Sequence, residues 1–276
     1  MSNTAVKSNL PVDQDIKPAW ILSLICAVLM GVLSLVGLLF ADSIYKSEVQ
    51  IQSYYTNDIV NFIVGLPILL GSMWLTNRGK FAGLLLWPGA LLYVIYNYTA
   101  YAVGRPFDIF TLAYLGIILI SAFSFYDLIR RIDSNSVKEQ LSGAVAEILA
   151  GWFLLIFGLL FLLRAANILV GARVNQAVLP PTEIGVSIAD IIISILWIFG
   201  GILLIRSKPL GYTTGLGLLF AASMLFVGLI IVLVIQPAFT AAPFSPFDII
   251  VVAVMGLFFS IPFILFLRGT IRADRH

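Results

Sequence analysis

The sequence predicts an all-α integral membrane protein that crosses the bilayer eight times. Of its 276 residues 61% are hydrophobic and 11% are charged, and the mean hydropathy is +1.05. A soluble domain is about half apolar and about one quarter charged. The apolar residues form continuous runs, and a helix needs about 20 such residues to cross the hydrocarbon core. The runs do not alternate with a period of two, which argues against a membrane β-barrel.

Eight apolar runs are long enough to cross a bilayer as helices. They are Ala19–Ala41, Asp58–Thr76, Phe81–Val103, Asp108–Ile129, Val145–Val170, Glu183–Ile205, Gly211–Ile235 and Ile249–Leu267. The first run follows Lys7 and Lys17, as a secretory signal would. It is longer than the apolar region of a cleaved signal and ends without a small-residue cleavage site, so we expect a retained helix.

Basic residues in the loops predict the orientation of the chain, because short cytoplasmic loops are enriched in Lys and Arg. Twelve of the 16 Lys and Arg residues fall on the side of the two termini. The other side holds only Lys46, Arg105, Arg164 and Arg173. We therefore expect a cell-membrane protein with both termini in the cytoplasm. The basic rim suits anionic headgroups, but we prefer the simpler interpretation that it records helix insertion.

Two segments of the chain resemble one another and predict an internal duplication. Pro106-Phe107-Asp108-Ile109 recurs 140 residues later as Pro246-Phe247-Asp248-Ile249. Upstream the interval is 132 residues, pairing Asp58 with Asp190 and Gly79-x3-Gly83 with Gly211-x3-Gly215. We expect two four-helix repeats with the same orientation, related by an axis along the membrane normal. The aspartates that begin inward-running helices are expected to cap them.

The predicted organisation has five parts. They are a cytoplasmic tail (1–18), a first four-helix repeat (19–131), a cytoplasmic linker (132–142), a second four-helix repeat (143–268) and a short cytoplasmic tail (269–276).

Polar residues gather in the outer half of the first repeat and not at the matching positions of the second. Helical spacing aligns them, and such groups are costly when they face lipid. The candidate ligand-binding residues are Asn57, Asp58, Asn61, Tyr96, Asn97, Tyr101 and Arg105. One carboxylate, amides and aromatic faces would suit a small polar or cationic ligand. The alternative is that the tyrosines form an interfacial belt and Asn97 binds a neighbouring helix, and we rank it first.

Arg164 and Asp190 form a second candidate cluster. Arg164 lies six residues inside the fifth span, roughly 9 Å from its outer end, and Asp190 lies at a similar depth in the sixth. Each is costly alone, so we predict an ion pair between these spans. Alternatively, Arg164 extends outward to the interface and Asp190 caps a helix that starts later.

The sequence lacks the residues that several classes of chemistry require. The chain has one cysteine, Cys26, and one histidine, the terminal His276, so it offers no disulfide framework, no Cys/His zinc site and no Ser/His dyad. No Gly-rich loop precedes a Lys-Ser/Thr pair. We therefore expect no metal and no cofactor, and catalysis is not the role that these residues favour. A net charge of +2 gives no indication of nucleic acid.

We hypothesise that the protein binds or translocates a small polar or cationic solute or ion through an outward-facing recess in the first repeat. The main alternative is a non-catalytic assembly, sensory or lipid-organising protein whose polar groups only hold helices together. A membrane enzyme acting on lipid ranks third. The expected partners are the lipid bilayer and a small solute, and packing of helices between copies would allow an oligomer.

Overall fold

The computed structural model describes residues 10–274 as a helical bundle. Eight of its helices are long and apolar enough to span a membrane, as the sequence predicts. Lys7, Arg275, His276 and half of the predicted N-terminal tail lie outside the described residues. The helices are α1 (Lys17–Leu39), α2 (Ala41–Ile44), α3 (Glu48–Gln50), η1 (Ile51–Tyr55), α4 (Thr56–Val60), η2 (Asn61–Gly65), α5 (Leu66–Asn77), α6 (Phe81–Val103), α7 (Ile109–Arg131), α8 (Ser134–Leu141), α9 (Glu147–Val174), α10 (Pro181–Ile205), α11 (Pro209–Phe239) and α12 (Pro246–Ala273).

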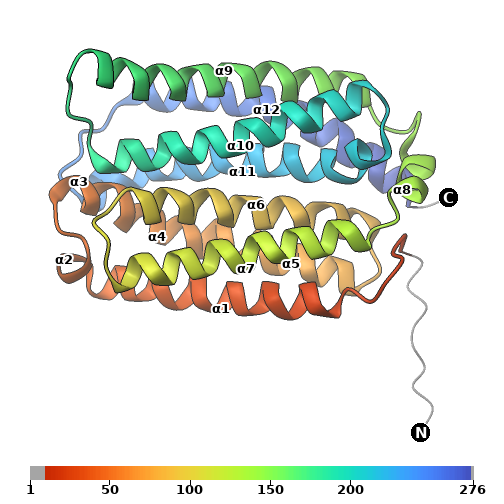
Figure 1. Ribbon diagram of the computed structural model, residues 1–276, viewed down its shortest axis with the longest axis horizontal. Helices are drawn as coiled ribbons and strands as arrows, with labels where there is room; N and C mark the ends of the chain where they lie inside the picture. The colour runs from red at the N-terminus through yellow and green to blue at the C-terminus, as the bar shows by residue number, and fades with distance from the viewer. Residues whose placement is uncertain (1–9, 275–276) are drawn as a thin grey trace, which may run out of the picture.

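The long helices run roughly along the longest axis of the molecule (Figure 1). The helices from α1 to α7 occupy one side of the bundle and those from α9 to α12 occupy the other (Figure 1). One end of the bundle holds α2 and α3, and the opposite end holds α8 (Figure 1). These are called the α2 end and the α8 end below. Helix α6 packs against both α10 and α11, and nearly all of its residues are buried.

Two glycines allow α6 and α11 to cross at very close range. A Cβ atom at Gly89 would collide with the Gly217 carbonyl, and one at Gly217 would lie 3.0 Å from the Gly89 nitrogen. Small residues at a helix crossing let two backbones approach until they are in van der Waals contact. This crossing joins the two halves of the chain at the centre of the bundle.

Corresponding features of the two halves recur at one constant interval along the chain. The turn Arg78-Gly79-Lys80 joins α5 to α6, and Arg206-Ser207-Lys208 joins α10 to α11, with positive φ at Gly79 and Ser207. Gly89 and Gly217 are separated by the same interval and contact each other. The interval of the predicted duplication is one helical turn longer. A shift of about one turn returns to nearly the same helix face, so the apolar pattern discriminates poorly between the two registers.

The second long helix begins earlier than the sequence predicts. It runs from Glu48 through five consecutive segments to Asn77, so Asp58 lies inside it and does not start it. Two turns of this helix, Ile51–Tyr55 and Asn61–Gly65, have π-helical geometry and lie on either side of Asp58. Single π-turns within α-helices are rare and occur frequently at functional sites.

The predicted role of aspartates as helix caps is correct only for Asp108. Its carboxylate accepts a hydrogen bond of 2.9 Å from the Thr111 N–H in a capping box at the start of α7. Ser245 caps α12 instead, and Asp248 lies in its first turn. Asp190 lies in the third turn of α10, which begins at Pro181. Asp58 and Asp190 are therefore buried within helices, where capping does not explain them.

The α8 end contains two features that the sequence did not predict. The expected linker 132–142 contains the helix α8. Residues before α1 bind to the end of α7, with hydrogen bonds from the Asp13 nitrogen to Arg131 (2.8 Å) and from the Asp133 nitrogen to Pro11 (3.0 Å). Both contacts hold the start of α1 beside the start of α8.

The α6–α11 crossing leads to a stability prediction. Gly89→Ala places a methyl group against the Gly217 backbone, so we expect a loss of about 1–3 kcal/mol and a lower thermal midpoint in detergent. Gly116→Ala is the matched control, because the Cβ position at Gly116 in α7 faces open space. Equal thermal midpoints for the two variants would show that the crossing does not hold the halves together.

Candidate functional site

A half-open cavity of about 540 Å³ lies between the two halves of the chain. Its volume is within the range of small-molecule sites, about 300–1,000 Å³. The first half contributes residues of α3, η1, α4 and α6, and the second half contributes residues of α9, α10 and α11, together with Pro180. Its lining residues are Val49, Ser53, Tyr54, Asn57, Tyr93, Tyr96, Asn97, Ala100, Tyr101, Phe161, Pro180, Thr182, Glu183, Val186, Asp190, Trp197, Leu225, Phe226, Gly228, Leu229, Val232, Leu233 and Gln236.

The cavity is long, and its character changes along its length. Thr182 and Glu183 lie in the first turn of α10 at the α2 end, whereas Trp197 lies about four turns further along the same helix. These residues span about 22 Å of helix. The wall near Trp197 is aromatic and aliphatic, with Phe161 and Phe226 beside it. The Trp197 Nε1 atom is buried and has no hydrogen-bond partner among the described residues.

Asp190 lies in the middle of the cavity wall and connects the two halves. One carboxylate oxygen accepts a hydrogen bond of 2.9 Å from the Tyr96 hydroxyl on α6. The other lies 3.0 Å from Arg164 Nη1 on α9. The Asp190 side chain is only 4% exposed, whereas that of Arg164 is 57% exposed. The structure thus brings the two residues of the predicted ion pair together and adds Tyr96 as a third member.

Amide side chains line the first-half wall of the cavity. Asn57 donates to Asn97 Oδ1 at 3.2 Å, and Asn97 donates to the Tyr93 carbonyl at 2.9 Å. Opposite them, Gln236 of α11 donates to the Gln52 carbonyl at 3.0 Å. Among the described residues no hydrogen bond reaches the side-chain oxygens of Asn57 and Gln236. These oxygens are therefore available to a hydrogen-bond donor or a cation.

Asp58 lies outside the cavity, buried between α1, α6 and the loop after α2. Its carboxylate accepts hydrogen bonds from the hydroxyls of Tyr45 and Tyr101, the latter at 2.9 Å. Burial and the nearby Asp58 carboxyl raise the pKa of Tyr45, which lies between α2 and α3, well above its ordinary value. Asn61 is also buried and donates to Ser34 at 3.4 Å.

The π-turns free backbone carbonyls for side-chain donors. A π-turn moves the local backbone bond from the fourth to the fifth residue, so a carbonyl beside it loses its usual N–H partner. In η1, Gln52 accepts from Gln236 and Tyr54 accepts from the Tyr101 hydroxyl at 3.1 Å. Both bonds fix the turn beside the cavity. Propensity and hydrophobic periodicity give no signal for such a turn.

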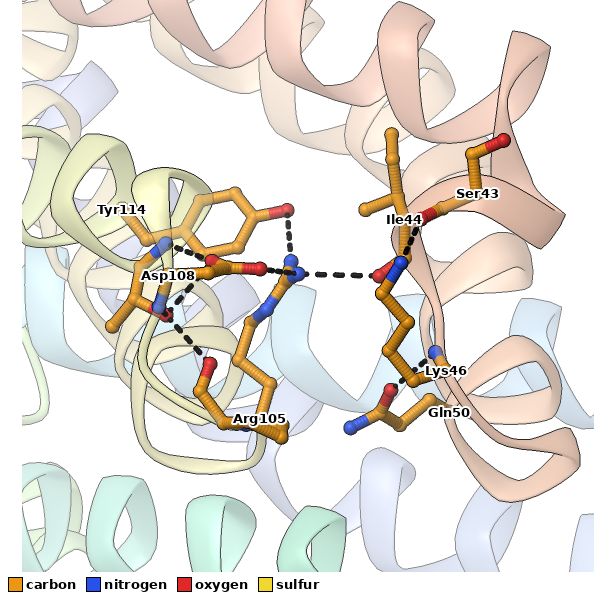
Figure 2. Close-up of polar contacts among 9 residues, drawn as sticks. Ser43, Ile44, Lys46, Gln50, Arg105, Asp108 and Tyr114 are labelled. Carbon is orange, nitrogen blue, oxygen red and sulfur yellow. Dashed lines mark hydrogen bonds and ion pairs between the residues drawn. The ribbon is translucent and has the colours of Figure 1, made fainter.

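Arg105 is held by the protein itself and does not line the cavity (Figure 2). It contacts Asp108 at 2.6 Å and donates to the Ile44 carbonyl at 3.2 Å and to the Tyr114 hydroxyl at 3.4 Å (Figure 2). It thereby ties the α6–α7 turn to α2. Partial burial acts to raise the pKa of Asp108, but the Thr111 N–H and the Arg105 charge outweigh it and hold that pKa below its ordinary value.

The predicted ligand-binding residues therefore divide into two groups. Asn57, Tyr96, Asn97 and Tyr101 line the cavity. Asp58, Asn61 and Arg105 do not, and each has protein partners. The cavity is also not a recess of the first repeat alone, because α9, α10 and α11 supply much of its wall.

Apart from Asp190, sequence analysis missed the second-half residues of the wall. Glu183 and Gln236 sit near helix ends, where polar residues are ordinary, and Trp197 belongs to a fully apolar run. Only the contact of α6 with α10 and α11 brings them to one cavity. The described residues contain no group of three His, Cys, Asp or Glu that would hold a metal ion.

Comparison of the chain with protein-family models, with curated proteins and with solved structures gives no match.

The Asp190 contacts lead to a second prediction. Arg164→Leu leaves a buried carboxylate with Tyr96 as its remaining partner, whereas Arg164→Leu with Asp190→Leu removes the charge as well. We expect the single variant to be less stable than the double variant, with a coupling energy of about 1–2 kcal/mol in a double-mutant cycle of thermal unfolding. Additive effects of the two substitutions would show that the ion pair does not contribute.

Proposed function

We propose that the protein spans the membrane with eight helices and carries the α8 end in the cytoplasm. The hydropathy of the helices supports the insertion. Most basic residues fall at the α8 end, among them Arg78, Lys80, Lys138, Arg206 and Lys208, which supports the orientation. The cavity then opens toward the outer face.

We propose further that the two halves are parallel repeats related by a pseudo-two-fold axis through the Gly89–Gly217 contact. A two-fold axis makes equivalent residues contact each other, which is the property of an isologous interface. Gly89 and Gly217 are in contact, and the interval between them equals the interval between the turns that precede their helices. Transporters with parallel repeats bind their substrates at the interface of the repeats.

The function that the geometry supports best is binding of a small amphipathic cation in the cavity between the halves. The main observation is the composition of the wall. Its free acceptors are the Asn57 and Gln236 amide oxygens and the Glu183 carboxylate, and Trp197 Nε1 at the inner end is a free donor. Tyrosine and phenylalanine rings and Trp197 supply aromatic faces, which attract cations. The aromatic inner end suits an apolar group of the same ligand.

Translocation would require the cavity to open at the α8 end, where α6 and α11 are in close contact. On the α8 side of Gly89, a Cβ atom at Gly217 of α11 would lie 3.0 Å from the Leu85 carbonyl of α6. This contact between the halves closes the interior toward the α8 end. Rocking of one half against the other about the Gly89–Gly217 contact would exchange the open side, as in alternating access.

Ligand binding is testable with benzyltrimethylammonium as the probe and with benzyl alcohol and benzoate as its neutral and anionic analogues. We expect the cation to bind to the protein in lipid nanodiscs and the other two to bind at least about tenfold more weakly, a difference of about 1.4 kcal/mol. Isothermal titration calorimetry measures the three affinities. Equal binding of all three compounds, or of none, would contradict the proposal.

Glu183→Gln identifies the site of that binding. It removes the unpaired carboxylate at the rim, so we expect about tenfold weaker binding of benzyltrimethylammonium. Asp248→Asn is the matched control, because Asp248 is an exposed carboxylate of α12 that does not line the cavity. Loss of affinity in both variants, or in neither, would place the cation outside this cavity. If the protein instead has an assembly role, benzyltrimethylammonium should not bind, and Glu183→Gln should change the oligomeric state.

A further inference from the structure

Asp58 is a buried carboxyl group without a cationic partner. Its side chain is 2% exposed, and none of the ion pairs in residues 10–274 includes it. The groups that face it are Ser34 on α1, Tyr45 after α2, Tyr98 and Tyr101 on α6 and Tyr114 on α7, and none of them is basic. The nearest arginine in this cluster, Arg105, is engaged by Asp108. An isolated carboxylate is costly in such surroundings, which calls for a bound cation.

The space around the Asp58 carboxylate limits which cation can bind there. A Cβ atom at Gly37 of α1 would collide with Asp58 Oδ2 and with the Tyr45 hydroxyl. The carboxylate therefore lies directly against the α1 backbone. Both of its oxygens already accept phenol donors. A metal ion needs several oxygen ligands around it, whereas a proton needs no additional volume.

We propose that Asp58 is a proton-binding site that is coupled to the cavity through Tyr101. The proposal of a proton site stands by itself, and the coupling rests on the proposed ligand binding. In the step a carboxylate oxygen of Asp58 forms an O–H bond with a proton delivered by hydronium from the solvent. One O–H bond of the hydronium breaks and leaves a water molecule, and Asp58 becomes the neutral acid.

Tyr101 has two acceptors within reach and links Asp58 to the cavity wall. Its hydroxyl lies 2.9 Å from Asp58 Oδ1 and 3.1 Å from the Tyr54 carbonyl. When Asp58 is ionised, the hydroxyl donates to the carboxylate. When Oδ1 carries a proton, Asp58 becomes the donor, and the Tyr101 hydroxyl turns its hydrogen to the Tyr54 carbonyl. The π-turn η1 makes that carbonyl available.

The same residues form part of the cavity wall. Tyr101 and Tyr54 both line the cavity and stack on each other with ring centroids 4.5 Å apart. A change of donor at Tyr101 therefore alters a bond to the backbone of the π-turn beside the ligand. The neutral acid also removes a negative charge near a cation site. Proton and cationic ligand should consequently oppose each other, and each weakens the other by the same factor.

Asp58 is also connected toward the α2 end of the bundle. Tyr45 donates to Asp58, and the Tyr114 ring packs beside Tyr101 with ring centroids 5.2 Å apart. Tyr114 accepts from Arg105, which contacts the partly exposed Asp108 (Figure 2). In this proposal the proton enters from the α2 end past the Tyr45 hydroxyl, with Arg105 as a fixed charge in the same cluster.

Infrared difference spectroscopy of the protein without ligand tests the proton site. We expect a carbonyl band of a protonated carboxylic acid to change between about pH 4 and about pH 9, a range that includes strongly shifted carboxyl groups. Asp58→Asn should abolish that band, and Asp248→Asn should keep it. An unchanged band in Asp58→Asn would overturn the proposal. If Asp58→Asn does not fold, Tyr101→Phe serves as the test. This substitution removes one hydrogen bond to the Asp58 carboxyl, so the band must shift. An unshifted band would overturn the proposal.

The pH dependence of ligand affinity tests the coupling separately. We expect benzyltrimethylammonium to bind more tightly as pH rises and Asp58 loses its proton, and to release protons from the protein in weakly buffered solution. Asp58→Asn should lose that part of the pH dependence and the proton release. If the ligand binds with full pH dependence in Asp58→Asn, the coupling is wrong. If no ligand binds while the infrared band is present, the proposed function fails and the proton site stands.

Discussion

The close crossing of α6 and α11 at Gly89 and Gly217 is the contact on which the rest of the bundle depends. It brings a helix of each half into the centre and leaves nearly every residue of α6 buried. Because the backbones touch at this point, the helices that follow toward the α2 end enclose the space between the halves. The cavity lies in that space, with α6 and α11 on two of its sides.

Polar side chains inside the bundle are arranged so that most have a partner. Asp190 binds Tyr96 and Arg164, and Arg105 binds Asp108. The π-turn at Ile51–Tyr55 supplies carbonyl acceptors to Tyr101 and Gln236. On the cavity wall, the side-chain oxygens of Asn57 and Gln236 accept no hydrogen bond from the described residues. Asp58 accepts hydrogen bonds but has no cationic partner. Protonation removes this uncompensated charge, which is why we propose a proton site there.

Most of the helical architecture follows from the sequence, because length and hydropathy define a long apolar helix. The span Phe81–Val103 coincides with α6, and the Asp108 cap lies where the sequence predicts it. The start of the second long helix differs from the predicted start, because its first turns, Glu48–Asn57, are polar and lie outside the apolar run. The sequence does not predict the π-turns beside Asp58, because helix propensity depends on residue type and does not distinguish an i→i+5 turn from an i→i+4 turn. The division of the polar residues between a cavity and a buried core depends on contacts with α10 and α11, which lie far away in the chain.

Cysteine labelling in intact cells tests directly whether the cavity between the halves opens to the outer face. The native Cys26 is buried, so we expect little background labelling from it. Ser53→Cys places a thiol on the cavity wall at the α2 end, and Lys138→Cys places one on α8. A membrane-impermeant maleimide should label the thiol at position 53, more slowly when benzyltrimethylammonium is present, and should not label the thiol at position 138. Labelling at position 138 from outside would contradict the orientation, and no labelling at position 53 would contradict a cavity that is open to the outer face.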